Sequence, residues 1–131
     1  MSIQRFRWAW LLFKASRAEH ADDYNLALSL FDEADGIKPL PDNRRAQRAL
    51  ILLRAQRLEE AQSALAQLRA EFSGSTNPDR QYLWRWTTAT LALMRSAPSQ
   101  AEYEAQAARD IPCSRLLRWR FPLLVSDQNR D

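Results

Sequence analysis

The sequence contains few of the residues on which several protein classes depend. Its 131 residues include two glycines, one cysteine and one histidine. An all-β fold of this length would need more glycine in its turns, so the shortage favours helices. It also leaves no glycine-rich phosphate-binding loop. The single cysteine, Cys113, excludes a disulfide within the chain and predicts a reducing compartment.

Long apolar runs are also missing. The run from Trp8 to Phe13 covers six residues before Lys14 interrupts it. A signal-peptide core needs roughly 7–15 apolar residues, and a membrane-spanning helix needs roughly 20. We therefore expect neither a cleaved leader nor a transmembrane segment, and we predict a cytoplasmic protein.

Charge of one sign is not concentrated anywhere in the chain. Lysine and arginine number 19 against 16 acidic residues, for a net charge of +3, and only Lys14 and Lys38 are lysines. A dedicated nucleic-acid binder usually carries a denser basic patch, so nucleic acid is not an expected partner. With 46% hydrophobic and 27% charged residues, the composition is that of a globular domain.

Apolar side chains at helical spacing, separated by prolines, predict an all-α chain of six to seven helices. In the first helix, Ile3, Phe6, Trp10 and Phe13 follow the spacing of one helix face. The predicted helices cover residues 2–19, 22–35, from 42 or 43 onward, 58–72, 79–96, 99–110 and 114–121. We expect one helical-repeat domain over residues 1–125 and a polar, frayed tail over 126–131.

Several residues are expected to begin or end these helices. An aspartate is the predicted N-cap of the second helix, and a serine with a following glutamate has the spacing of a capping box for the sixth. Both glycines follow amphipathic segments, where a C-terminal cap favours a residue that tolerates positive φ. The residues concerned are Asp22 or Asp23, Ser99 with Glu102, and the glycines Gly36 and Gly74.

A repeat appears when the second and fourth predicted helices are compared. Four pairs of apolar positions are separated by one constant interval: Tyr24 and Leu58, Ala27 and Ala61, Phe31 and Leu65, Ala34 and Leu68. With these residues in place, "YNLALSLFDEADGIKP" resembles the second helix of a tetratricopeptide repeat, and "AQRLEEAQSALAQL" resembles the turn and second helix of the next one. The interval equals the period of that repeat, which is about 34 residues. The resemblance implies antiparallel helix-turn-helix units. A helical bundle without repeats would share much of this pattern.

A third, degenerate unit follows at a longer interval. Ala101, Ala105, Ala108 and Pro112 resemble the same second-helix pattern, but the interval from Ala61 to Ala101 exceeds the repeat period by six residues. We expect the loop "SGSTNPD" to absorb the six additional residues.

The resemblance implies a protein–protein interaction module, a scaffold or chaperone that holds a peptide or helix of a partner. In this family the first helices of the units usually line a concave groove. The groove residues implied here are Arg44, Gln47, Arg54, Gln81, Trp84 and Thr88. The arginines would suit an acidic partner. Self-association into a structural oligomer is the alternative.

Two tryptophan pairs and a basic C-terminal segment leave further interpretations open. Residues two apart on a helix point to nearly opposite faces, so Trp10 and Trp86 are expected to pack against neighbouring helices. Trp8 and Trp84 suit either packing or a binding surface. The C-terminal segment suits a helix that caps the last repeat, our preferred interpretation, or a surface that binds anionic membranes or nucleic acid. Its candidate residues are Arg115, Arg118, Trp119 and Arg120.

No motif predicts catalysis, a metal or a cofactor. His20 lies beside Glu19, Asp22 and Asp23 without the spacing of a known metal-ligand motif, and it is the only histidine. Cys113 lacks the sequence context of a nucleophile. The carboxylate pairs fall in first turns of predicted helices, where acidic residues suit the helix dipole: Glu59 with Glu60, and Glu102 with Glu104.

Overall fold

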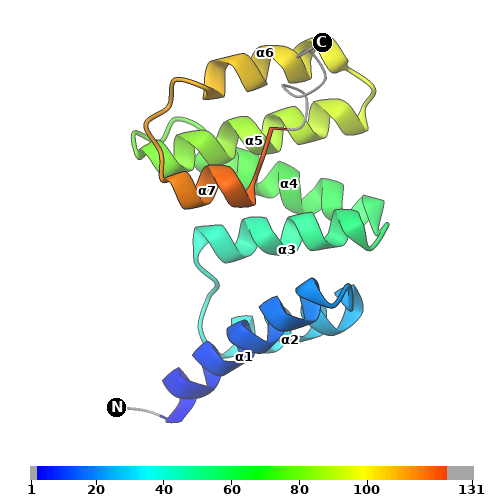
Figure 1. Ribbon diagram of the computed structural model, residues 1–131, viewed down its shortest axis with the longest axis vertical. Coiled ribbons are helices and arrows are strands. Elements are labelled where there is room, and N and C mark those ends of the chain that lie inside the picture. Colours follow the sequence, from blue (N-terminus) through cyan, green and yellow to red (C-terminus); the bar gives the residue numbers. More distant parts are fainter. Residues whose placement is uncertain (1–2, 124–131) are drawn as a thin grey trace. The chain divides into compact units, whose positions relative to one another are not determined.

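The computed structural model describes residues 3–123 and confirms the predicted all-α class. Over these residues it contains seven helices and no strand (Figure 1). The helices are α1 (Ile3–His20), α2 (Tyr24–Ile37), α3 (Asp42–Arg54), α4 (Leu58–Phe72), α5 (Pro78–Met94), α6 (Pro98–Ala108) and α7 (Arg115–Arg120). The chain divides into two compact units, residues 1–61 and 62–131. The proposed single domain over 1–125 stays a prediction, and the polar tail over 126–131 lies outside the described residues.

The N-terminal unit is built on the hairpin of α1 and α2, and α3 also packs against α2 (Figure 1). Asp23 is the N-cap of α2, as predicted, and its side chain accepts a hydrogen bond from the Leu26 amide. The core of α1 consists of Leu11, Leu12, Ala15 and Ala18. The corresponding face of α2 buries Ala27, Leu28, Leu30, Phe31 and Ala34.

One turn recurs between the helices of each pair. Asp22, Gln56 and Ser96 all adopt a left-handed conformation, with φ of 60°, 63° and 58°. Each amide donates to the carbonyl three residues earlier, and the next amide donates to the carbonyl five residues earlier. This is the hydrogen-bond pattern of a Schellman motif, which closes a helix C-terminus. The intervals between the three turns are the same as those between the repeated alanines Ala27, Ala61 and Ala101.

The second helices share the predicted small positions. Helices α2 and α4 begin one repeat period apart, and α6 begins six residues later than a second period would place it. The matching residues Ala27, Ala61 and Ala101 are all 0% exposed. Small side chains at this position let each helix approach its neighbours closely. The helix-turn-helix arrangement is therefore repeated in the structure as well as in the sequence.

The six additional residues of the third unit are not in the loop, so that prediction was wrong. The segment between α4 and α5 covers residues 73–77, one residue more than the segment 38–41 between α2 and α3. Helix α5 has 17 residues against 13 in α3, and α4 has 15 against 14 in α2. Most of the insertion is one added turn at the start of α5, residues 78–81.

The C-terminal unit is built on the hairpin of α5 and α6, with α7 covering α5 (Figure 1). The Tyr82 hydroxyl donates to the Phe121 carbonyl over 2.6 Å, and both residues are buried. The rings of Trp86 and Phe121 meet edge to face at 4.8 Å. Burial raises the pKa of Tyr82 to about 12, since the interior disfavours the phenolate. These contacts attach the C-terminal end of α7 to α5.

Local details of several predictions need correction. Gly36 lies inside α2 instead of ending it, because the helix continues to Ile37, whereas Gly74 has the expected positive φ of 78°. The capping box of Ser99 does not form, because Pro98 already occupies the first turn of α6 and Ala97 is the N-cap. The last helix has a serine cap, since the Ser114 side chain accepts from the Leu117 amide.

The expectation for the tryptophans was right for Trp86 and wrong for Trp10. Trp86 is 3% exposed, whereas Trp10 is 50% exposed and stacks on Phe13. No helix among residues 3–123 combines the length and the apolarity needed to cross a membrane.

Candidate binding pocket in the C-terminal unit

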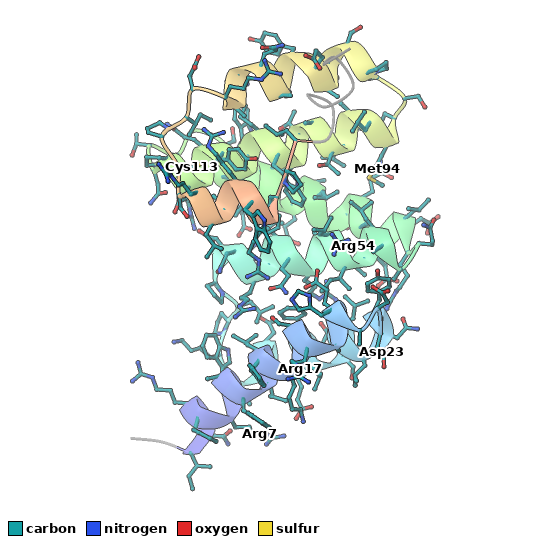
Figure 2. The ribbon with its side chains drawn as sticks, in the orientation of Figure 1. Arg7, Arg17, Asp23, Arg54, Met94 and Cys113 are labelled. Carbon is teal, nitrogen blue, oxygen red and sulfur yellow. The ribbon has the colours of Figure 1, made fainter. Side chains whose placement is uncertain are left out.

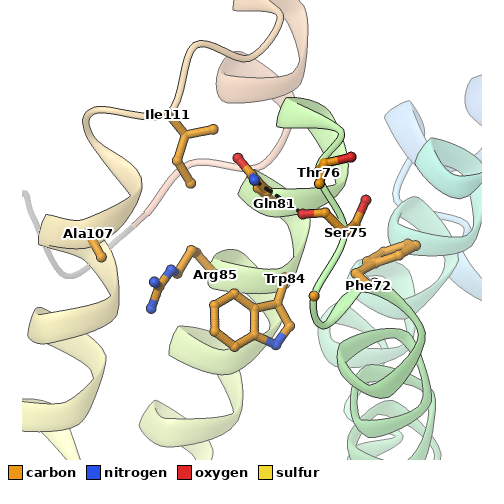
Figure 3. A pocket seen from close by; sticks show the side chains of 9 residues that line it. Phe72, Ser75, Thr76, Gln81, Trp84, Arg85, Ala107 and Ile111 are labelled. Atoms are coloured by element: carbon orange, nitrogen blue, oxygen red, sulfur yellow. Dashed lines mark hydrogen bonds between the residues drawn. The ribbon is translucent and has the colours of Figure 1, made fainter.

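A pocket of about 520 Å³ lies within the C-terminal unit (Figure 3). It is bordered by the end of α4, the segment that follows it, α5, and the end of α6 with the segment beyond. Its lining residues are Phe72, Gly74, Ser75, Thr76, Gln81, Trp84, Arg85, Ala107 and Ile111. A pocket of this volume suits a side chain or a short stretch of peptide.

One wall of the pocket is polar and is shaped by the α4–α5 segment. The Ser75 amide donates to the Phe72 carbonyl, and Gly74 supplies the left-handed residue that this turn requires. The Gln81 side-chain amide donates to the Ser75 carbonyl over 3.1 Å (Figure 3). Gln81 belongs to the added turn of α5, so this turn both lengthens the helix and holds the wall in place.

Another part of the pocket is formed by the Trp84 ring, which contacts from α5 and α6 hold in place. The Arg85 guanidinium lies 4.3 Å from the centre of the Trp84 ring, a cation–π contact. Arg85 donates in turn to the Glu104 carboxylate of α6 over 2.7 Å, and the Glu104 side chain is 9% exposed. This series of contacts from α6 to α5 fixes the Trp84 ring, which remains half-buried at the pocket (Figure 3).

The groove residues predicted for the N-terminal unit lie in a polar network between α3 and α1. Arg44 donates to the Ser16 hydroxyl over 2.9 Å, and the Gln47 amide donates to the Glu19 carboxylate over 2.6 Å. Arg54 donates to the other Glu19 oxygen over 2.9 Å. Glu19 thus joins Gln47 and Arg54, and Gln47 is 2% exposed.

Two of the three residues predicted for the C-terminal unit line the same pocket. Gln81 and Trp84 do so, whereas Thr88 is buried and its hydroxyl donates to the Trp84 carbonyl over 2.8 Å. The longer interval between the second and third units was the one sign in the sequence that this region differs. Sequence reasoning missed lining residues from four different parts of the chain, namely Phe72, Ser75, Arg85 and Ile111.

The arginines of the C-terminal basic segment have different surroundings. The Arg118 guanidinium donates to the carbonyls of Ala108, Arg109 and Ile111 at the end of α6, and lies 5.1 Å from the Tyr82 ring centre. Such contacts satisfy carbonyls that a helix end leaves free. Of the other candidates on α7, two are exposed, Trp119 at 75%, and one is partly buried. These are Arg115, Trp119 and Arg120.

The pKa shifts of Cys113 and Glu60 have local physical causes. Cys113 is half-buried, and burial raises the pKa of its thiol, which lowers the fraction of the nucleophilic thiolate. Glu60 pairs with Arg57 at 2.7 Å, and this contact lowers the pKa of the carboxyl. Within residues 3–123, no three His, Cys, Asp or Glu side chains gather closely enough to hold a metal ion.

Neither a protein-family model, nor a curated protein, nor a solved structure matches this chain.

Proposed function

We propose that the protein is a tetratricopeptide-like interaction module that binds a peptide segment of a partner protein in the pocket of the C-terminal unit. The observation that carries this proposal is the combination of the Trp84 ring with a wall of main-chain and hydroxyl groups at residues 74–76. An aromatic side chain in a preformed pocket is a common anchor for a binding partner. The adjacent polar wall suits the main chain of a bound peptide.

The preferred ligand is a peptide that places one apolar side chain against Trp84 and Ile111. Arg85 borders the same pocket, and the chain carries a net charge of +3, so an acidic residue next to the apolar anchor would favour binding. The proposed binding is non-enzymatic and needs no cofactor. A cytoplasmic location is in keeping with the single cysteine.

Selection of peptides followed by NMR tests this proposal. Random peptides displayed on phage are selected on the full chain, and the enriched peptides are titrated into the ¹⁵N-labelled protein. We expect the Trp84 indole signal and the amides of residues 73–77 and 81–85 to shift most. Trp84→Ala should weaken binding at least tenfold, about 1.4 kcal/mol, because it removes the anchor surface.

Trp119→Ala is the matched control, because Trp119 is an exposed tryptophan of the same unit outside the pocket. It should leave the affinity unchanged. Peptides that bind equally well to the Trp84→Ala variant, or that shift residues of α1–α3 instead, would show that the pocket is not the binding site.

A further inference from the structure

Helix α1 carries apolar residues on two faces, and only one of them is covered. Leu11, Leu12, Ala15 and Ala18 are buried against the rest of the N-terminal unit. On the other face, four large apolar side chains are exposed to solvent: Ile3 (85%), Phe6 (74%), Trp10 (50%) and Phe13 (50%). Helices of globular proteins usually present polar residues on their outer face, so this second face needs an explanation.

The exposed apolar residues form a continuous stripe. With about 100° between successive residues of a helix, the four fall within an arc of about 80°. Arg17 lies in the same arc, and its guanidinium is 6.0 Å from the Phe13 ring centre. Lys14 and Arg7 lie at the border of the arc, by the same spacing. We call Ile3, Phe6, Trp10, Phe13, Lys14 and Arg17 the outer face of α1.

The charge of this helix has one sign at its surface. Its basic residues are Arg5, Arg7, Lys14 and Arg17, and its only carboxylate is Glu19. The Glu19 side chain is 12% exposed and accepts from Gln47 and Arg54 of α3. Arg7 contacts Glu33 of α2 at 2.6 Å. Figure 2 shows Arg7 and Arg17 at different points along α1. The outer face itself therefore joins aromatic residues with cations and contains no carboxylate.

We propose that the outer face of α1 binds an anionic phospholipid surface, with the helix lying in the plane of the interface. Apolar and aromatic side chains would enter the boundary between headgroups and acyl chains, while Lys14 and Arg17 contact lipid phosphates. Trp10 suits this boundary, because an indole ring is apolar and its N–H still reaches polar headgroups. This function is separate from peptide binding in the C-terminal pocket and does not depend on it.

Charge favours a lipid surface over a second copy of the chain. A symmetric dimer through this face would bring together two basic surfaces without a carboxylate, so Lys14 and Arg17 of neither copy would gain an opposite charge from the other outer face. Like charges at an interface oppose association. An anionic bilayer instead provides complementary charge across the whole stripe.

Co-sedimentation with vesicles tests the proposal. The full chain is mixed with vesicles of phosphatidylcholine alone, or of phosphatidylcholine and phosphatidylglycerol in similar amounts, at graded salt. We expect binding to the anionic vesicles only, weakening as salt rises because the screening length shortens. Lys14→Gln with Arg17→Gln should lower the partition coefficient by at least tenfold, since each cation near such a surface contributes about fivefold.

Trp10→Ser separates the apolar contribution and should lower binding by roughly tenfold. Trp119→Ser is its matched control, because Trp119 is 75% exposed and also lies beside arginines, on α7. It should bind as the unchanged protein does. Circular dichroism of every variant checks that the helices are intact.

Several results would overturn the proposal. These are absence of binding at low salt, equal binding to both kinds of vesicle, or loss of binding with Trp119→Ser and not with Trp10→Ser. Concentration-dependent self-association that Trp10→Ser abolishes, without vesicle binding, would assign the outer face to a second copy of the chain. Peptide binding in the C-terminal pocket would be unaffected by any of these results.

Discussion

The two units close their helix pairs with the same turn but fill the space between the helices differently. In the N-terminal unit, Glu19 of α1 accepts from Gln47 and Arg54 of α3, so charged and polar groups join the helices. In the C-terminal unit, an ion pair between Arg85 and Glu104 also joins α5 to α6, but aromatic residues join α5 to the end of α7. The Trp86 ring contacts the Phe121 ring, and the Tyr82 hydroxyl donates to the Phe121 carbonyl. The shared turn sets the direction in which the second helix of a pair follows the first. The side chains that join the helices differ between the two units.

Matched positions show how this difference arises. When α3 and α5 are aligned by the turns that follow them, Ala46 corresponds to Trp86. Both are buried, at 0% and 3% exposure. A large ring at this position needs a covering element, which α7 supplies through Phe121, and the added turn of α5 supplies the wall of the pocket. The pocket of the C-terminal unit is therefore bordered by the added turn, which α3 lacks.

The largest effect is expected from Trp86→Ala. Removal of this buried ring leaves a cavity beside Phe121, and we expect the unfolding free energy to fall by about 3–5 kcal/mol. Native-state hydrogen exchange would locate the loss, which should be greatest at amides of α5, α6 and α7. The control is Trp10→Ala, which removes a half-exposed tryptophan of the other unit and should cost less than about 1 kcal/mol. Equal costs for the two variants would contradict the contrast between the units.

A smaller effect, confined to alkaline pH, is expected from Tyr82. Its pKa is raised by burial to about 12, above the ordinary value near 10, so the folded state holds the proton more tightly than the unfolded state. The resulting stability is fully present below about pH 10 and is lost as pH rises through about 12. Urea titrations at pH 8 to 12 should therefore show falling stability. Tyr82→Phe should flatten this dependence while lowering stability at neutral pH by roughly 1–2 kcal/mol, because the Phe121 carbonyl loses its donor. If the Tyr82→Phe variant lost as much stability at alkaline pH as the unchanged protein, another group would be the one that titrates.

Much of the architecture could be predicted because it depends on local patterns. Apolar spacing and prolines located all seven helices, and the repeat interval matched buried alanines of α2 and α4 correctly. The outer face of α1 was less predictable. Its apolar residues have the spacing of a core-facing stripe, and sequence periodicity does not distinguish a stripe that meets a neighbour from one that meets solvent.

The candidate pocket was only partly predictable because it depends on register. Gln81 and Thr88 lie one repeat period after Gln47 and Arg54, but α5 aligns with α3 at the longer interval set by their turns. Thr88 therefore has the position of Arg48 and points into the unit. Arg85 lines the pocket and is held there by its ion pair with Glu104 of α6, a tertiary contact that no local sequence pattern encodes.

The smallest effect tests the feature that the two units share. Gln56 and Ser96 hold equivalent left-handed turns, at φ of 63° and 58°, and glycine adopts this conformation without steric cost. The left-handed conformation of these two residues was not predicted, because neither residue favours positive φ. Gln56→Gly and Ser96→Gly should each raise the unfolding free energy by about 0.5–1 kcal/mol, measured by urea denaturation. Gln56→Val and Ser96→Val should instead destabilise the protein, since a β-branched side chain is strained there. If glycine stabilised one turn and destabilised the other, the turns would not be equivalent, and the repeat would be a likeness of helix order alone.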